Sequence, residues 1–291
     1  MKHDGIITPM VTPFNRKGEI DYAATEKLIA YLKKIGVSGL FPLGSTGLFP
    51  FLREEERKKY LEFVADHASG LKLYAGIGSA STQISSDLAK ECNDLPVDVM
   101  VLMPPYYIQP GQKEIMKHFE EVLKNVKKEL FIYNIPQLSG TFIDPDTVSK
   151  LKENYSQITG LKESSGDMRY FSKIMEFSGP NFSIFQGQDD LLLPSLAIGA
   201  DGGVCGLTNF SDPVIRCYKA YRRGDLEEAR KIQFGEINAI MKVINADRFP
   251  SGYYHAFYTR NHIDGGYRPP MLEPAADSKK HSEEFLSKLK D

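Results

Sequence analysis

Cysteines and long apolar runs are scarce in this chain of 291 residues. Its three cysteines, Cys92, Cys205 and Cys217, show no Cys-x-x-Cys spacing, which excludes a zinc motif or disulfide framework and predicts buried free thiols. No apolar run approaches the roughly 20 residues of a membrane span. An excess of one charge is also lacking, because the net charge is −2 and both signs are intermixed. We therefore expect no nucleic-acid or membrane partner, and small neutral or anionic metabolites remain.

Two further absences concern location and domain number. Met1–Gly5 contains no apolar stretch of the kind that opens a secretory signal peptide, so we expect a cytoplasmic protein. No low-complexity linker divides the chain. Its length exceeds that of an ordinary single domain, but it fits the roughly 250 residues plus additions of a β/α barrel.

Short apolar runs alternate with amphipathic stretches along the first part of the chain. The stretches between the runs carry apolar residues at helical spacing, which predicts helices between strands. Such alternation favours a parallel sheet, and eight units favour its closure. We predict an α/β fold, an eight-stranded parallel β/α (TIM) barrel in residues 1–212. The predicted strands are Gly5–Thr8, Gly39–Phe41, Leu71–Ala75, Val97–Leu102, Leu130–Tyr133, Ile158–Lys162, Phe182–Gln186 and Gly202–Cys205.

After the eighth predicted strand the sequence indicates helices with no strands between them. The predicted helices are Pro213–Arg222, Leu226–Ile244 and Ser282–Lys290. We predict that residues 213–291 form a helical C-terminal extension, which includes the last barrel helix and packs on the barrel.

Two reactive side chains stand at the ends of predicted strands. Lys162 ends an apolar run before Glu163-Ser164-Ser165-Gly166, and Tyr133 ends the preceding run. Burial of a lysine at an apolar strand end favours the neutral amine, which attacks a ketone to form a Schiff base. A tyrosine on the neighbouring strand end supplies the proton shuttle that iminium chemistry needs. Alone, the two residues are equally compatible with a solvated lysine and a core tyrosine with a satisfied hydroxyl.

Other polar groups follow predicted strands. Active sites of β/α barrels lie where the C-terminal ends of the strands feed the following loops. After the second strand, Ser45 and Thr46 stand between glycines in a tight turn, whose backbone N–H groups suit a carboxylate. Tyr106 and Tyr107 follow the fourth strand, where adjacent aromatic residues more often serve packing than catalysis.

Two carboxylates follow the seventh predicted strand. Asp189 and Asp190 are each able to accept hydrogen bonds from substrate hydroxyls or to cap the predicted helix Leu191–Ile198. We assign Asp189 to the ligand and Asp190 to the cap.

Five short motifs occur in order at these strand ends. They are Thr8-Pro9 with Thr12-Pro13-Phe14, Gly44-Ser45-Thr46-Gly47, Pro105-Tyr106-Tyr107, Tyr133-Asn134-Ile135-Pro136 and Gly160-Leu161-Lys162. This order, which spans nearly the whole chain, resembles the pyruvate-dependent class I aldolases of the dihydrodipicolinate synthase and N-acetylneuraminate lyase superfamily.

The resemblance implies a role for each motif residue. Lys162 would form the Schiff base with pyruvate or another 2-oxo acid, Tyr133 would relay protons, and Ser45 and Thr46 would bind the carboxylate. Tyr107 would reach from a neighbouring subunit into the site, which implies an oligomer, usually a homotetramer built as a dimer of dimers. No metal or organic cofactor is implied, because the iminium serves as the electron sink.

Departures from the family patterns bear on the substrate. Synthases that use aspartate semialdehyde carry an arginine where this chain has Leu138, and an apolar side chain cannot replace a bidentate guanidinium. Sialic acid lyases usually carry glutamate and serine where this chain has Leu48 and Gly206. Relatives that cleave the 6-phosphorylated sugar acid use an arginine and a tyrosine where this chain has Pro110 and Ile135.

Gly44–Leu48 together with Gly266–Pro270 resembles the archaeal 2-keto-3-deoxygluconate aldolases. That resemblance implies reversible cleavage of 2-keto-3-deoxy-D-gluconate to pyruvate and D-glyceraldehyde, as in the non-phosphorylative Entner–Doudoroff pathway. Ser164, Gly187 and Asp189 are the candidates for the sugar hydroxyls.

Three alternatives stay open. The first two are an N-acetylneuraminate lyase and a dihydrodipicolinate synthase-like enzyme. The third, a non-catalytic 2-oxo acid binding protein, would not need a desolvated lysine beside a tyrosine. Activity on the 6-phosphate would require basic groups elsewhere, such as Arg248 or Arg268.

Overall fold

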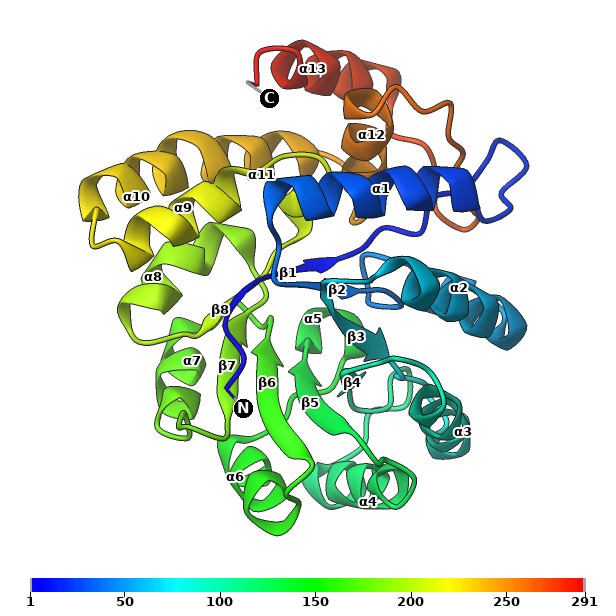
Figure 1. Cartoon of the computed structure of the whole chain (residues 1–291), viewed down its shortest axis with the longest axis vertical. Coiled ribbons are helices and arrows are strands. Elements are labelled where there is room, and N and C mark those ends of the chain that lie inside the picture. Colours follow the sequence, from blue (N-terminus) through cyan, green and yellow to red (C-terminus); the bar gives the residue numbers. More distant parts are fainter. Residues whose placement is uncertain (1, 290–291) are drawn as a thin grey trace.

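The computed structural model describes residues 2–289 and has a closed barrel of eight parallel strands surrounded by helices (Figure 1). Each strand pairs with the next along the chain, and β8 pairs with β1. The predicted eight-stranded barrel is therefore confirmed. The strands are β1 Gly5–Pro9, β2 Gly39–Phe41, β3 Lys72–Gly76, β4 Val99–Leu102, β5 Glu129–Asn134, β6 Ile158–Glu163, β7 Ser183–Gln186 and β8 Gly202–Val204.

The interior of the barrel is a packed core. The Phe131 ring lies with its centroid 5.6 Å from that of Tyr74 and 5.8 Å from that of Phe185. These aromatic rings fill the space below the C-terminal ends of the strands. A ligand therefore reaches the barrel only at that end, as is usual for this fold.

The helices that alternate with the strands begin and end at recognisable capping residues. In α1, Asp21 caps the Ala24 N–H at 2.9 Å, and Gly36 ends the helix in the left-handed conformation at φ 81°. The helices of the barrel are α1 Tyr22–Ile35, α2 Glu54–His67, α3 Thr82–Asn93, α4 Gln112–Leu123, α5 Pro136–Ser139, α6 Pro145–Asn154, α7 Met168–Met175, α8 Leu192–Ala197 and α9 Pro213–Arg222.

The predicted helix Leu226–Ile244 is not continuous. It consists of α10 (Leu226–Ile232), a π-helical turn (Gln233–Ile237) and α11 (Asn238–Ile244). Together with α9 these helices lie along one side of the barrel (Figure 1). The prediction of one helix assumes a single α-helical period, which does not include the extra residue that a π turn inserts.

Two more helices close the described chain. The first, α12 (Ser251–Arg260), was not predicted, because Ser251–Tyr258 are all buried and show no one-sided apolar pattern. The second, α13 (Ala276–Leu286), begins before the predicted Ser282 and ends at Leu286; the predicted end, Lys290, lies outside the described residues.

Tyrosine hydroxyls fasten α12 to the segment after β1. The Tyr254 hydroxyl accepts the Thr12 N–H at 3.1 Å, and the Tyr258 hydroxyl accepts the Phe14 N–H at 3.0 Å. Buried backbone donors need such partners, so α12 is an integral part of the fold. The C-terminal helices are thereby fixed relative to the strand ends.

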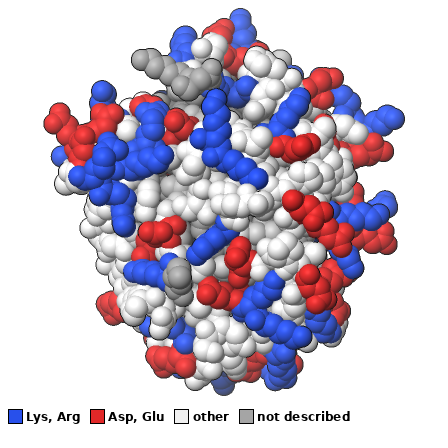
Figure 2. Space-filling model, in the orientation of Figure 1, with Lys and Arg blue, Asp and Glu red and all other residues white. Residues whose placement is uncertain are grey.

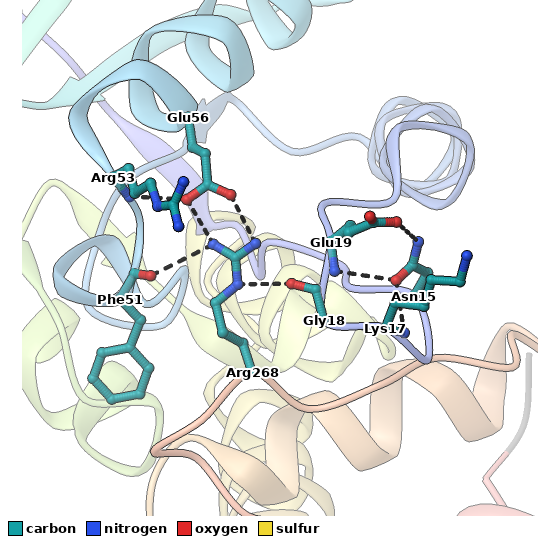
Figure 3. Close-up of polar contacts among 8 residues, drawn as sticks. All are labelled: Asn15, Lys17, Gly18, Glu19, Phe51, Arg53, Glu56 and Arg268. Carbon is teal, nitrogen blue, oxygen red and sulfur yellow. Dashed lines mark hydrogen bonds and ion pairs between the residues drawn. The ribbon is translucent and has the colours of Figure 1, made fainter.

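Arg268 fastens the segment after α12 (Figure 3). Its Nη1 and Nη2 atoms both donate to the Glu56 carboxylate at 2.8 Å, and its Nε donates to Gly18 O at 2.8 Å. The guanidinium also lies over the Phe14 ring, 4.6 Å from the centroid. A planar bidentate pair of this kind fixes orientation as well as distance. Arg268 therefore joins the C-terminal segment to the start of α2.

The distribution of charge on the surface and the burial of the cysteines agree with the expectations from the sequence. On the face in Figure 2, Lys and Arg side chains are interspersed with Asp and Glu side chains. Across residues 2–289, every helix is too short or too polar to span a bilayer. The predicted buried free thiols are confirmed, and burial raises the pKa of Cys92 and Cys217 to about 12.

Candidate active site

A cavity of about 240 Å³ opens at the C-terminal ends of the strands. It brings together every predicted site residue except Tyr107. The predicted residues that line it are Ser45, Thr46, Tyr133, Lys162, Ser164, Gly187 and Asp189. The loops after β2, β5, β6 and β7 therefore converge on one site, as the barrel geometry predicts.

Lys162 and Tyr133 are register partners on the neighbouring strands β6 and β5. Side chains alternate along a strand, so partners in register project to the same side, here the barrel interior. Lys162 Nζ lies 4.1 Å from the centroid of the Tyr133 ring and 5.1 Å from that of Phe41. Both residues are at most 5% exposed. The amine thus stands among aromatic faces at the floor of the cavity.

The turn after β2 presents hydroxyls and backbone donors to the cavity. Ser45 Oγ lies 3.3 Å from Tyr133 Oη, which links this turn to the phenol beside Lys162. Thr46 is buried and also lines the cavity. Within residues 2–289, neither the Ser45 nor the Thr46 backbone N–H donates a hydrogen bond. Backbone N–H groups that lack an acceptor and lie beside hydroxyls make a suitable site for a carboxylate.

The backbone of this turn adopts left-handed conformations at both ends. Leu43 has a φ of 61° and Leu48 a φ of 55°, which are uncommon values for residues with a branched side chain. Thr12 Oγ1 donates to Gly47 O at 2.7 Å, and a Cβ at Gly47 would come within 2.8 Å of the Met10 carbonyl oxygen. Close packing therefore holds a strained turn in place, an arrangement that is common at functional sites.

Ser164 and Gly187 lie against Lys162. A Cβ on Gly187 would come within 1.8 Å of Ser164 Oγ and 3.0 Å of Lys162 Cε, so only glycine fits there. Ser164 N donates to Asn134 O at 2.9 Å, which fixes the backbone. Its buried hydroxyl has no hydrogen-bond partner among the described residues. A buried, unpaired hydroxyl beside the amine is a candidate ligand for a substrate oxygen.

Asp189 connects the loops after β7 and β8. Its two carboxylate oxygens accept the backbone N–H groups of Gly206 at 3.0 Å and Leu207 at 2.8 Å. Burial raises the pKa of Asp189 to about 7, in opposition to these two hydrogen bonds. Its role as a ligand for sugar hydroxyls stays a prediction. The assignment of Asp190 as a helix cap is wrong, because the N-cap of α8 is Leu191, without a capping side chain.

Glu163 is a second buried carboxyl beside the site. It accepts a hydrogen bond from Asn134 Nδ2 at 2.7 Å and another from the Ser165 N–H. Burial raises its pKa to about 7. Since neighbouring residues on a strand face opposite sides, Glu163 supports the β5 and β6 loops from outside the cavity.

Several cavity residues were missed by the sequence reasoning. Met241, Asn245, Phe249 and Tyr253 come from α11, α12 and the segment between them and form one wall. No local motif distinguishes these residues, since they follow the last strand by many residues. The predicted C-terminal extension therefore completes the cavity that the barrel loops begin.

Tyr107 lies apart from the cavity of its own chain. It is 90% exposed, has a φ of 79°, and precedes Ile108, which is 79% exposed. Its predicted reach into a neighbouring subunit stays a prediction.

Arg248 and Arg268, the two arginines considered for a phosphate site, differ in their position relative to the cavity. Arg268 is bound to Glu56 and Gly18 outside the cavity, so it is not placed to bind a phosphate there. Arg248 lines a hollow that adjoins the cavity at Phe249. Metal-ligand geometry is lacking in residues 2–289, where His, Cys, Asp and Glu nowhere gather in threes around a possible ion.

The chain resembles known proteins over almost its whole length. Residues 2–289 match the model of the dihydrodipicolinate synthetase family. The chain is 52% identical over 287 residues to an uncharacterised DapA-like lyase of Thermoplasma acidophilum, covering 99% of this chain and 98% of that protein.

A second relative has both a sequence and a solved structure. The 2-dehydro-3-deoxy-D-gluconate/2-dehydro-3-deoxy-phosphogluconate aldolase of Picrophilus torridus is 46% identical over 262 residues, covering 90% of this chain and 97% of that protein. The structure of 2-keto 3-deoxygluconate aldolase from Picrophilus torridus superposes with a TM-score of 0.91 at 45% identity, covering 94% of this chain and 98% of that chain.

A third comparison extends the likeness to the synthases. Dihydrodipicolinate synthase from Aquifex aeolicus superposes with a TM-score of 0.94 at 30% identity, covering 98% of each chain. The family match and these relatives agree with a buried lysine and tyrosine at the strand ends of a barrel. The chain therefore belongs to the dihydrodipicolinate synthetase family and is a class I pyruvate-dependent lyase.

Proposed function

We propose that this protein cleaves 2-keto-3-deoxy-D-gluconate to pyruvate and D-glyceraldehyde and catalyses the reverse condensation. The observation that carries the proposal is the Lys162 amine, 4.1 Å from the Tyr133 ring at the floor of a cavity of about 240 Å³. The Picrophilus aldolase, whose name includes this substrate under its synonym 2-dehydro-3-deoxy-D-gluconate, supports it. In that role the enzyme would serve a non-phosphorylative Entner–Doudoroff pathway.

The chemistry begins with the amine. Neutral Lys162 attacks the C2 ketone, and Tyr133 donates its proton to the departing hydroxyl, so that water leaves and an iminium forms beside the Tyr133 phenolate. Tyr133 then takes the proton from the C4 hydroxyl, and the C3–C4 bond breaks as its electrons move to the iminium nitrogen. D-Glyceraldehyde departs and leaves an enamine. Protonation at C3 and hydrolysis then release pyruvate and free Lys162.

The surrounding groups have binding roles. Ser45 and Thr46, with their free backbone N–H groups, hold the carboxylate of the 2-oxo acid. Ser164, Gly187 and Asp189 face the sugar chain, and the unpaired Ser164 hydroxyl is the strongest candidate of the three. No metal or organic cofactor takes part in these steps.

The 6-phosphorylated acid is the second candidate substrate. The name of the Picrophilus aldolase includes it. In this chain Pro110 and Ile135 provide no charge for a phosphate, whereas Arg248 lies in the hollow beside the cavity. We favour the unphosphorylated acid, because a phosphate dianion gains most from charge-assisted hydrogen bonds.

Oligomerisation completes the proposal. Tyr107 extends from its own chain, 90% exposed, and would complete the site of a neighbouring subunit in a homotetramer. Its hydroxyl would then join the proton path of Ser45 and Tyr133. Sedimentation at micromolar protein concentration gives the oligomer size directly.

A substrate panel tests the proposed activity. Steady-state kcat/KM should be highest for 2-keto-3-deoxy-D-gluconate among that acid, its 6-phosphate, N-acetylneuraminate, and pyruvate with aspartate semialdehyde. Leu138 in place of the synthase arginine disfavours the last reaction. Higher efficiency with N-acetylneuraminate or aspartate semialdehyde would overturn the proposal, and binding of pyruvate without any turnover would favour a non-catalytic role.

A further inference from the structure

Two glutamine side chains meet at one backbone carbonyl in the cavity. Gln137 Nε2 donates to Ser164 O at 2.5 Å, and Gln188 Nε2 donates to the same oxygen at 2.7 Å. Gln137 lies in α5 after β5, Ser164 follows β6, and Gln188 follows β7. The pair therefore joins three consecutive strand-end loops. Both side chains also line the cavity that contains Lys162.

The Ser164 carbonyl determines the orientation of the Gln137 and Gln188 side-chain amides. A carbonyl oxygen only accepts, so both Gln137 and Gln188 must present their nitrogen to Ser164 O. Each amide keeps its Oε1 acceptor and a second N–H. Within residues 2–289, no hydrogen bond uses either of these Oε1 atoms. Half of each amide is thus available to a molecule in the cavity.

The charged and polar residues that line the cavity indicate which kind of molecule binds there. Among the described residues of the lining, Lys162 is the only cation and Asp189 the only carboxylate, and Asp189 already accepts two backbone N–H groups. Asn245 adds a third amide at the end of α11. Neutral amides both donate and accept, as hydroxyl groups do, whereas phosphates and carboxylates are better matched by arginine.

We propose that Gln137 and Gln188 bind the hydroxyl groups on the aldehyde half of the substrate and so select polyhydroxylated aldehydes. This inference rests on the proposed function, in which the 2-oxo acid half is attached to Lys162. The aldehyde half then extends past Ser164 toward the two amides. Because Ser164 O already anchors both side chains, binding orders them little further.

The test runs the reaction in the condensation direction with saturating pyruvate. It compares D-glyceraldehyde with propanal, which has the same carbon chain length and no hydroxyl group. Gln137→Met and Gln188→Met keep the side-chain length and remove the amide. Each should lower kcat/KM for D-glyceraldehyde roughly 10-fold and leave propanal nearly unchanged, because only the hydroxylated aldehyde loses a hydrogen bond. The control Gln83→Met, exposed on α3, should change neither.

The outcomes separate binding from positioning. Equal losses for both aldehydes would mean that the amides only position Ser164 and Lys162, and would overturn the inference. A wild-type enzyme that does not prefer D-glyceraldehyde would also overturn it. Gln137 is exposed, so Gln137→Met remains decisive if Gln188→Met does not fold.

The same experiment also tests the proposed aldolase activity, independently of the glutamine variants. If borohydride traps pyruvate on Lys162 and both aldehydes condense, the proposed activity stands whatever the glutamine variants do. Absence of trapping and of condensation in the wild type would count against the activity itself.

Discussion

Ser45 Oγ lies 3.3 Å from Tyr133 Oη, so a hydroxyl of the turn after β2 is within hydrogen-bond reach of the phenol at the end of β5. The contact joins the proposed carboxylate site to the proposed acid–base group. A proton taken up by Tyr133 is therefore stabilised by a neighbour that is able to accept a hydrogen bond. Removal of the Tyr133 hydroxyl by mutation therefore tests the proposed acid–base role directly.

Tyr133→Phe keeps the ring beside Lys162 and removes the hydroxyl. We expect kcat to fall by roughly 10²- to 10⁴-fold, the usual contribution of a positioned acid–base group. Pyruvate trapping on Lys162 should decline much less than turnover. Tyr170→Phe is the matched control, because it removes a buried hydroxyl that donates to Ile143 O outside the cavity. Near-normal kcat in Tyr133→Phe would show that another group moves the proton.

Lys162 should carry the covalent intermediate. Borohydride reduction in the presence of pyruvate should add one reduced pyruvoyl group there, identified by peptide mass spectrometry, and should abolish activity. Lys162→Ala should show neither label nor turnover. Lys152→Ala is the control, since Lys152 also lies over an aromatic ring, that of Phe182, but outside the cavity. Label on any other lysine contradicts the assignment.

These strand-end residues could be predicted from the sequence, because parallel barrel strands are buried apolar runs and their C-terminal ends converge. Helix α3 shows why helix starts are also readable locally, since its N-cap Ser81 supplies a side chain that accepts the Ile84 N–H. The wall that contains Met241 and Asn245 could not be predicted, because tertiary packing alone brings it to the strand ends. Helix α12 escaped detection for a related reason, since a helix buried on all sides shows no amphipathic period.

The preference of the wild-type enzyme between the phosphorylated and the unphosphorylated acid tests the proposal that the cavity lacks a charged phosphate site. kcat/KM for 2-keto-3-deoxy-D-gluconate should exceed that for its 6-phosphate, because each missing charge-assisted contact forgoes about 1.5–3 kcal/mol. Arg248→Ala should leave both values nearly unchanged. A preference for the phosphorylated acid that disappears in Arg248→Ala would instead assign the phosphate site to the hollow beside Phe249.

Glu163 should make stability depend on pH. Burial raises its pKa to about 7, whereas the unfolded chain releases this proton near pH 4.3. The folded state thus holds more protons between these values, so this stabilisation is complete below about pH 4.3 and is lost as the pH rises to 7. Urea unfolding should therefore show that the advantage of wild type over Glu163→Gln shrinks from pH 4.5 to 7. A difference that grows with pH would show that the carboxyl is ionised.

Arg268 should contribute to the stability of the fold but not to catalysis. Arg268→Ala removes the bidentate bonds to Glu56 and the bond to Gly18, and should lower the free energy of unfolding by about 1–3 kcal/mol. Arg16→Ala removes a pair with Asp264 that is exposed, and should lower the free energy of unfolding less than Arg268→Ala does. Urea denaturation measures both. Equal effects would show that the partly buried pair between Arg268 and Glu56 adds nothing beyond a surface contact.

The π turn at Gln233–Ile237 sets the rotational phase of α11 relative to α10. A π turn inserts one residue into an α-helix, and one residue corresponds to a rotation of roughly 100°. Gln233 is held there by hydrogen bonds to the Asp189 and Asp190 carbonyl oxygens. Deletion of a single residue from this turn would rotate Met241 and Asn245 away from the cavity while leaving the barrel whole. The orientation of this wall of the site thus depends on one inserted residue.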